Sequence, residues 1–289
     1  MAKLTGRLCV LLLAYSLALP IFAEPLFQFQ NLTKKEGLSS SAVYQTVEDK
    51  NGFIWFATED GLQKYDGFEF VTYRFDRADS NSLSNNIVRT LLVDKSGALW
   101  VGTDRGLNLY SQNFDHFIRF KHNPELAASI NSDHIRSLSQ SADGTIWVGT
   151  SAGLNKIDPK TRKVTAYPHF KVRSIFEDDH RQLWIGTLNH GLFLFNRLTG
   201  GFKPVGLTQS VGGVSSSLAE QLSIVDIYQD TFERVLVATW GSGVFELQRD
   251  RSSLVSIPLE LPSQYVRSIH QDTKGALWFG TKQGILVHE

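Results

Sequence analysis

The stretch Gly97–Tyr110, GALWVGTDRGLNLY, decides the fold, because five further copies of it recur along this chain of 289 residues. The other copies are GFIWFATEDGLQKYD (52–66), GTIWVGTSAGLNKID (144–158), RQLWIGTLNHGLFLF (181–195), ERVLVATWGSGVFEL (233–247) and GALWFGTKQGILVHE (275–289). Aligned on the Trp position, the six anchors are Trp55, Trp100, Trp147, Trp184, Leu236 and Trp278. They are 45, 47, 37, 52 and 42 residues apart, a spacing typical of one supersecondary unit repeated along the chain.

Each copy predicts antiparallel strands joined by tight turns. Six positions before the anchor, five copies carry Asp, and in three of them Gly follows three residues later. In this pairing Asp folds back onto the backbone and Gly supplies the positive φ of a hairpin turn. The small Ala or Gly two positions after the anchor lets a neighbouring backbone or ring approach closely. Before the turn we expect a first strand opened by Val43, Val88, Ile135, Val172, Ile224 or Val266.

The rest of each copy predicts two more strands. A third strand follows the second Gly, and a variable, aromatic fourth strand follows it, as in 68–73 and 114–120. Four antiparallel strands in about 45 residues form a propeller blade. We therefore predict an all-β protein, a β-propeller of six recognisable four-stranded blades over residues 24–289. Each repeat buries its faces only against its neighbours, which favours a ring over independent hairpins.

Closure of the ring stays open at this point. The last copy ends at Glu289, after its third strand, and Leu26–Thr33 (LFQFQNLT) has the pattern of an outer fourth strand that precedes the first blade. That strand either completes the sixth blade and closes a six-blade ring, or belongs to a seventh blade that this chain lacks.

The first 23 residues predict export. Lys3 and Arg7 form a basic start, an apolar run follows from Leu8, Pro20 interrupts it, and Ala23 offers a small residue for cleavage. The run is 16 residues long, shorter than the roughly 18–20 that span a bilayer. We therefore expect a cleaved signal peptide and an exported, soluble protein, rather than an uncleaved anchor.

Composition and motifs exclude several classes of function. Basic and acidic residues both number 29, so the chain lacks the strongly basic surface that nucleic-acid binding requires. The single Cys, Cys9, lies in the leader, which excludes a disulfide scaffold, a zinc knuckle and a thiol enzyme. The sequence contains no H-E-x-x-H, Walker loop or G-x-S-x-G, and one Asp per blade cannot converge on one cation. We expect no metal, no cofactor and no catalytic residue.

The copies resemble the two-component-regulator propeller repeat, whose pattern is D-x-x-G-x-[LI]-W-[IV]-G-T-x-x-G-L. GALWVGTDRGLN and GTIWVGTSAGLNKID agree with it at nearly every defining position, and the resemblance extends over Leu26–Glu289. The fifth copy departs most, with Leu236 for Trp and Glu233 for the turn Gly. The resemblance implies the extracytoplasmic sensing region of a bacterial membrane receptor. In that family the output is a histidine kinase or a GGDEF-type diguanylate cyclase, full-length relatives are anchored in the inner membrane, and homodimers are expected.

Four copies carry Arg directly after the residue that opens the first strand: Arg89, Arg136, Arg173 and Arg267. The first strand of a blade is the innermost, so these residues are predicted to ring one mouth of the central channel and to favour an anionic ligand such as a carboxylate or an acidic sugar. The alternative is that each Arg pairs with an acidic residue of the adjacent blade. Trp240, outside the anchor positions, lies in a loop, where it either stacks on a sugar or fills a blade interface.

These observations predict a non-enzymatic, periplasmic ligand-sensing propeller, the input region of a signalling receptor without its output domain. The expected partners are a small anionic or saccharide ligand and other domains or subunits of the receptor. Two alternatives remain: an exported propeller enzyme, such as a lyase related to the streptogramin-inactivating propellers, and a stand-alone saccharide- or protein-binding propeller.

Overall fold

Each copy of the repeat folds into its own antiparallel sheet, or blade, whose strands follow one another in chain order. This computed structural model describes residues 31–208, 219 and 221–289. The predicted signal peptide and residues 26–30 of the candidate outer strand lie outside the described residues. Thr33–Glu289 form one unit, which contains all six blades.

The first three blades have four strands each, and a short 3-10 helix, η1 (Lys34–Glu36), precedes them. Blade 1 consists of β1 (Val43–Glu48), β2 (Ile54–Thr58), β3 (Gly61–Tyr65) and β4 (Phe70–Tyr73). Blade 2 consists of β5 (Val88–Val93), β6 (Leu99–Thr103), β7 (Gly106–Ser111) and β8 (His116–Phe120). Blade 3 consists of β9 (Ile135–Gln140), β10 (Ile146–Thr150), β11 (Gly153–Ile157) and β12 (Val164–Pro168).

The last three blades differ from one another in strand number. Blade 4 consists of β13 (Val172–Glu177), β14 (Leu183–Thr187), β15 (Leu192–Phe195) and β16 (Phe202–Pro204). Blade 5 consists of β18 (Ile224–Gln229), β19 (Val235–Thr239), β20 (Val244–Leu247) and β21 (Ser253–Ile257), with β17 (Gly206–Leu207) added in parallel to its outer edge. Blade 6 consists of β22 (Val266–Gln271), β23 (Leu277–Thr281) and β24 (Gly284–His288). All six first strands begin at the predicted residues.

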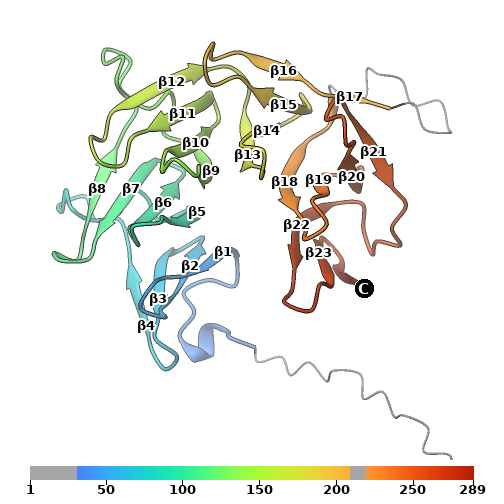
Figure 1. The fold of residues 1–289 in the computed structure, drawn as a ribbon. Coiled ribbons are helices and arrows are strands. Elements are labelled where there is room, and N and C mark those ends of the chain that lie inside the picture. Colours follow the sequence, from blue (N-terminus) through green and yellow to red (C-terminus); the bar gives the residue numbers. More distant parts are fainter. Residues whose placement is uncertain (1–30, 209–218, 220) are drawn as a thin grey trace, which may run out of the picture. The chain divides into compact units, whose positions relative to one another are not determined.

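The blades follow one another around a common centre, and the first strand of each blade lies innermost (Figure 1). First strands of successive blades contact each other from β1 to β22. The predicted six-blade β-propeller is therefore confirmed. The sequence did not predict β17, whose two residues continue directly from blade 4 and cover the outer edge of blade 5.

The Asp of the repeat does more than shape a turn. In blade 2, Asp94 accepts backbone N–H bonds from Ser96 and Ala98 on one carboxylate oxygen and the indole N–H of Trp100 on the other, at 2.9 Å. Burial would raise the pKa of Asp94, but the hydrogen bonds from Ser96 and Trp100 hold it below its usual value. The buried anchor ring is thus tied to the turn of its own blade. The same indole-to-carboxylate bond forms between Trp55 and Asp49, Trp184 and Asp178, and Trp278 and Asp272.

The two copies that break the pattern find other partners. In blade 3 the hydroxyl of Ser141 accepts the indole N–H of Trp147 at 2.8 Å. In blade 5, Leu236 has no indole, and Nε of Arg234 donates to the Asp230 carboxylate at 2.7 Å. Blade 5 therefore keeps its turn and a buried anchor, although it departs most from the repeat.

Small residues after the anchor allow a close approach, as the sequence predicts, but the approaching group is the Val or Ile side chain that opens the next blade and not a backbone or a ring. A Cβ on Gly149 would lie 2.6 Å from Cγ1 of Val172, which opens the first strand of the next blade. Gly102 meets Ile135, and Gly186 meets Ile224, in the same way. Each of these opening residues is almost fully buried, so side chain and glycine fit together at each junction.

The pair Val43 and Gly280 differs from these junctions. Val43 is 37% exposed, whereas the residues that open the other first strands are at most 1% exposed. A Cβ on Gly280 would meet Ser268 of its own blade and no atom of blade 1. Blade 1 and blade 6 therefore do not repeat the contact of an opening Val or Ile with a glycine that joins blades 2 to 5 in succession. Within the described residues, no helix is long and apolar enough to cross a membrane.

Candidate functional site

The four predicted arginines lie at one end of the blades. Each follows the first residue of an innermost strand, and that first residue pairs with the Thr that ends the second strand, as Val88 pairs with Thr103. The turns between second and third strands therefore share this end with the arginines. We call this end, with Arg89, Arg136, Arg173, Arg267 and Trp240, the channel mouth.

Arg89 is held by its own blade. Its Nε and Nη2 donate to the two oxygens of Asp104 at 3.0 and 2.7 Å, a bidentate pair with fixed orientation. Its guanidinium also lies 4.5 Å from the ring centre of Tyr44, the residue that takes the Arg position in blade 1. Asp104 directly follows the repeat Thr, in the turn between β6 and β7.

Arg136 shares the same carboxylate from the next blade, since its Nη1 lies 3.2 Å from Oδ1 of Asp104. Burial alone would raise the pKa of Asp104, but the hydrogen bond from Arg89 and the charges of Arg89 and Arg136 hold it below its usual value. One carboxylate thus bridges blades 2 and 3. For Arg136, the structure therefore shows the alternative to a free ligand-binding arginine, which is an ion pair with an acidic residue of the adjacent blade.

Arg173 has a different environment. Its side chain is partly buried, and within the described part of the chain no acidic group pairs with it. Burial, and then the positive charges of Arg136 and Arg267, lower its pKa, although a guanidinium remains protonated. The positive charges of Arg136 on blade 3 and Arg267 on blade 6 therefore act on Arg173, and no acidic side chain among the described residues offsets its charge.

Arg267 and Trp240 form one cluster. The Arg267 guanidinium lies 4.8 Å from the ring centre of Trp240. The ring of Tyr265 packs edge-on against the same indole, with the two ring centres 5.1 Å apart. Trp240 is partly buried, while Arg267 and Tyr265 are exposed. The loop that carries Trp240 is one residue longer than its counterparts in blades 1, 2, 3 and 6, which leaves room for the ring beside blade 6.

Sequence reasoning missed Asp104, Tyr44 and Tyr265 as members of this site. A usable signal existed for Asp104, because the residue after the repeat Thr is acidic in blade 2 but is Ser151 in blade 3 and Leu188 in blade 4. In blade 2 that position faces the Arg of the same blade. It therefore indicates which arginine is neutralised locally and which is not.

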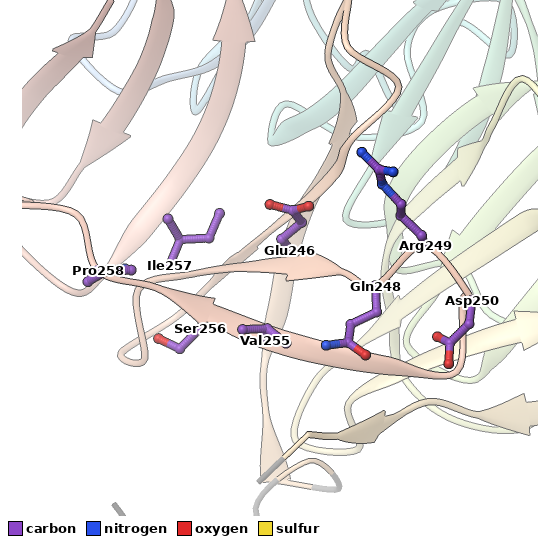
Figure 2. Close-up of a pocket in the computed structure, with 8 residues that line it drawn as sticks. All are labelled: Glu246, Gln248, Arg249, Asp250, Val255, Ser256, Ile257 and Pro258. Carbon is purple, nitrogen blue, oxygen red and sulfur yellow. The ribbon is translucent and has the colours of Figure 1, made fainter. Parts of the chain in front are cut away.

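A hollow of about 610 Å³ lies on the outer strands of blade 5, and none of the predicted site residues lines it. In the view of Figure 2, the side chains of Glu246 and Arg249 project to the same side of β20 and the turn that follows it. Val255 and Ile257 of β21 contribute apolar surface. Among the described residues, no three His, Cys, Asp or Glu side chains gather as metal ligands.

Comparison with known proteins places these features in a family. The family model described as two component regulator propeller matches residues 37–60, 82–105, 129–152 and 260–283. Each match covers the linker into a blade, its first strand, the turn and the Trp strand. These are the same parts of blades 1, 2, 3 and 6.

The relatives are larger than this chain. Histidine kinase P4 of Formosa agariphila is 45% identical over 58 residues, which are 20% of this chain and 4% of the kinase. The extracellular domain of BT3049 from B. thetaiotaomicron, described as a hybrid two-component system, is 26% identical with a TM-score of 0.76. The alignment covers 90% of this chain and 35% of that one, so this chain spans about a third of that domain.

An enzyme of the same fold is also similar. Virginiamycin B lyase of Staphylococcus aureus, in an inactive variant with quinupristin, is 12% identical with a TM-score of 0.64, over 90% of this chain and 87% of the lyase. At that identity the likeness shows the fold alone. The matched repeats, the blades they form and the likeness to BT3049 agree, and four of the six blades carry repeats that match the two component regulator propeller family.

Proposed function

We propose that this chain is a periplasmic, non-enzymatic ligand-sensing propeller, the input region of a membrane signalling receptor, and that it binds a small anionic or saccharide ligand at the channel mouth. The observation that carries the ligand site is the charge of Arg173, which no acidic side chain among the described residues offsets and on which the charges of Arg136 and Arg267 act. The match of four repeats to the family model and the likeness to a histidine kinase and to the BT3049 domain support the signalling role.

The channel mouth divides into a neutralised side and a charged side. Arg89 and Arg136 share Asp104, so an incoming anion would have to compete with a carboxylate there. Arg173 offers its donors without that competition, in a partly buried place where charge-assisted hydrogen bonds are strong. An anionic group of the ligand therefore belongs at Arg173.

The aromatic cluster of blades 5 and 6 supplies the second half of the site. Trp240 and Tyr265 present ring surface next to the Arg267 guanidinium. Aromatic rings pack against the apolar face of a sugar, and arginine stacked on an aromatic ring keeps its donors free at the edges. A ligand that reaches from Arg173 to Trp240 contacts blades 4, 5 and 6, so its binding would alter how these blades present themselves to neighbouring receptor domains.

Calorimetry with matched pairs of oligosaccharides, identical except that one member carries carboxylates, tests this proposal. We expect the acidic member to bind more tightly, Arg173→Gln to weaken it at least tenfold, and Arg249→Gln, which changes an exposed arginine on the outer part of blade 5, to leave it unchanged. Equal binding of both members with no loss in Arg173→Gln would overturn the anion site. Loss in Trp240→Ala alone would place the ligand on the aromatic cluster instead.

A further inference from the structure

Gln45 joins two innermost strands with both ends of its amide. It lies two residues after Val43 on β1, and its Nε2 donates to the carbonyl of Leu91 at 3.1 Å while its Oε1 accepts the N–H of Leu91 at 2.9 Å. Leu91 lies on β5 of the next blade. The side chain thus satisfies both backbone groups that one residue of the neighbouring inner strand presents, which stabilises the junction between blades 1 and 2.

Asp226 takes the same position at the junction between blades 5 and 6. It lies two residues after Ile224 on β18, and its Oδ2 accepts the N–H of Ile269 at 2.9 Å. Ile269 lies three residues after Val266, as Leu91 lies three residues after Val88. The other oxygen of Asp226 accepts the N–H of Ile227 at 2.9 Å. An ionised carboxylate only accepts hydrogen bonds, so it has no donor for the carbonyl of Ile269.

We propose that Asp226 is a proton-binding site on the wall of the channel, and that the bound proton tightens the junction between blades 5 and 6. A proton from solvent adds to a carboxylate oxygen and forms an O–H bond, and no other bond changes. The neutral acid then has one donor and one acceptor for Ile269, as the amide of Gln45 has for Leu91. This inference is independent of the proposed ligand site.

The surroundings of Asp226 favour the neutral form. Burial raises the pKa of Asp226 to about 6, although the backbone N–H bonds from Ile269 and Ile227 act in the opposite direction. The strands that pack against β18 are β13, β14, β19 and β22. Their charged or titratable side chains are Arg173, Glu177, Arg267 and His270. Arg267 stacks on Trp240 and Glu177 pairs with Arg197. Among the described residues no cation, Arg173 and His270 included, acts on the carboxyl of Asp226.

The sign of the effect follows from linkage. A free Asp has a pKa of about 3.9, below the value near 6 in the folded protein, so the folded state binds this proton more tightly than the unfolded chain does. The resulting stabilisation is fully present below about pH 4 and is lost as the pH rises through 6. A difference of about two pKa units corresponds to about a hundredfold change in the folding equilibrium constant.

A reciprocal pair of variants tests the proposal in the full chain. Asp226→Asn supplies a permanent donor and should make the protein more stable than wild type at pH 7.5. The ratio of the variant's folding equilibrium constant to that of wild type should be up to about a hundredfold higher at pH 7.5 than at pH 4. Gln45→Glu places a carboxylate at the matching junction and should introduce the same pH dependence there. Urea unfolding between pH 4 and 8, with each variant compared with wild type, measures both effects.

Titration of the Asp226 carboxyl by carbon NMR keeps the test decisive if a variant fails to fold. The expected midpoint is near pH 6, and assignment comes from the signal lost in Asp226→Asn or, failing that, from through-bond connection to the Ile227 amide. A midpoint near 4 overturns the proposal. So does a difference in stability between Asp226→Asn and wild type that stays constant from pH 4 to 8.

Discussion

The indole N–H of Trp100 donates to the carboxylate of Asp94, six residues earlier, at 2.9 Å. Both residues are buried, and the bond crosses the hairpin between the first and second strands of blade 2. Because four blades contain this bond, the spacing of Asp and Trp in the repeat has a physical cause. The Asp94 carboxylate accepts hydrogen bonds from the backbone N–H groups of the turn and from the indole N–H of the core ring.

Asp94→Ala should therefore destabilise the protein more than loss of a turn residue does. The change leaves the buried indole of Trp100 and the backbone N–H groups of Ser96 and Ala98 without their acceptor. A buried unsatisfied donor costs about 1–3 kcal/mol, so we expect roughly 3 kcal/mol in urea unfolding. Asp272→Ala in blade 6 is the matched control, and its cost should be smaller because Trp278 is less deeply buried. Equal costs at the two sites would contradict the role given to burial.

Acid should remove part of this stability. The hydrogen bonds to Asp94, and the arginines beside Asp104, keep the pKa of both carboxyls below the ordinary value. The folded state therefore holds these protons less tightly than the unfolded chain, and the stability is present above the unfolded pKa of about 4 and lost as the pH falls below it. Thermal unfolding from pH 6 down to pH 2.5 should show a falling Tm, with a shallower fall in Asp94→Asn. A slope unchanged by Asp94→Asn would show that other carboxyls dominate.

Blade 5 offers a rescue experiment. Arg234 supplies the donor that Leu236 lacks, and the Asp230 side chain that accepts it is fully buried. Arg234→Ala should cost about 1–3 kcal/mol, because the carboxylate loses its partner. Adding Leu236→Trp to Arg234→Ala recreates the sequence pattern of blade 2 and should recover part of that loss. A double variant no more stable than Arg234→Ala alone would mean that the blade cannot accept the indole.

Substitution of the glycines after the anchor by Ala should destabilise the protein to different degrees. A Cβ on Gly149 would approach Val172 of the next blade to 2.6 Å and Ser137 to 2.2 Å, whereas a Cβ on Gly280 would meet Ser268 of its own blade alone. Overpacking of this kind costs about 1–3 kcal/mol. Gly149→Ala should therefore lower the Tm clearly and Gly280→Ala much less. If Gly280→Ala were equally costly, blade 1 would have to pack on blade 6 in solution as other neighbours do.

Much of the fold could be predicted because the same sequence pattern occurs in six copies. β-branched residues open the first strands, and the anchor, Thr and Gly fix the next two, so β5 and β13 begin where expected. The bond between Asp94 and Trp100 could not be predicted, since it depends on the rotamer of a ring across a hairpin. The strand β17 was missed because two residues carry no periodicity.

The placement of the four arginines at one end of the blades could be predicted, but the charges around each of them could not. That Arg89, Arg136, Arg173 and Arg267 share one end of the blades follows from strand order. Which of them is neutralised depends on the turn that faces each one, where Asp104 stands in blade 2 and Leu188 in blade 4. The charge of Arg173 is thus a property of the assembled ring, and repeat spacing alone does not reveal it.

Asp104 provides the most direct test of the charge at the channel mouth. Asp104→Asn removes the negative charge that Arg89 and Arg136 share, while the amide oxygen still accepts a hydrogen bond. The positive potential at Arg173 should rise, since Arg136 already acts on it. We expect carboxylate-bearing oligosaccharides to bind about two- to fivefold more tightly at low salt, with the gain reduced at 0.15 M salt, where the Debye length is about 8 Å.

The exposed pair of Arg74 and Asp60 gives the control for that measurement. Both side chains are half exposed, and Asp60→Asn changes the net charge by the same amount in the turn between β2 and β3 of blade 1, where Asp60 pairs with Arg74 rather than with an arginine of the channel mouth. Calorimetry at two salt concentrations should separate the variants, because Asp60→Asn should leave affinity unchanged. A loss of affinity in Asp104→Asn would mean that Asp104 positions Arg89 and Arg136 for direct contact with the ligand. The neutralised side of the mouth, rather than Arg173, would then hold the anion.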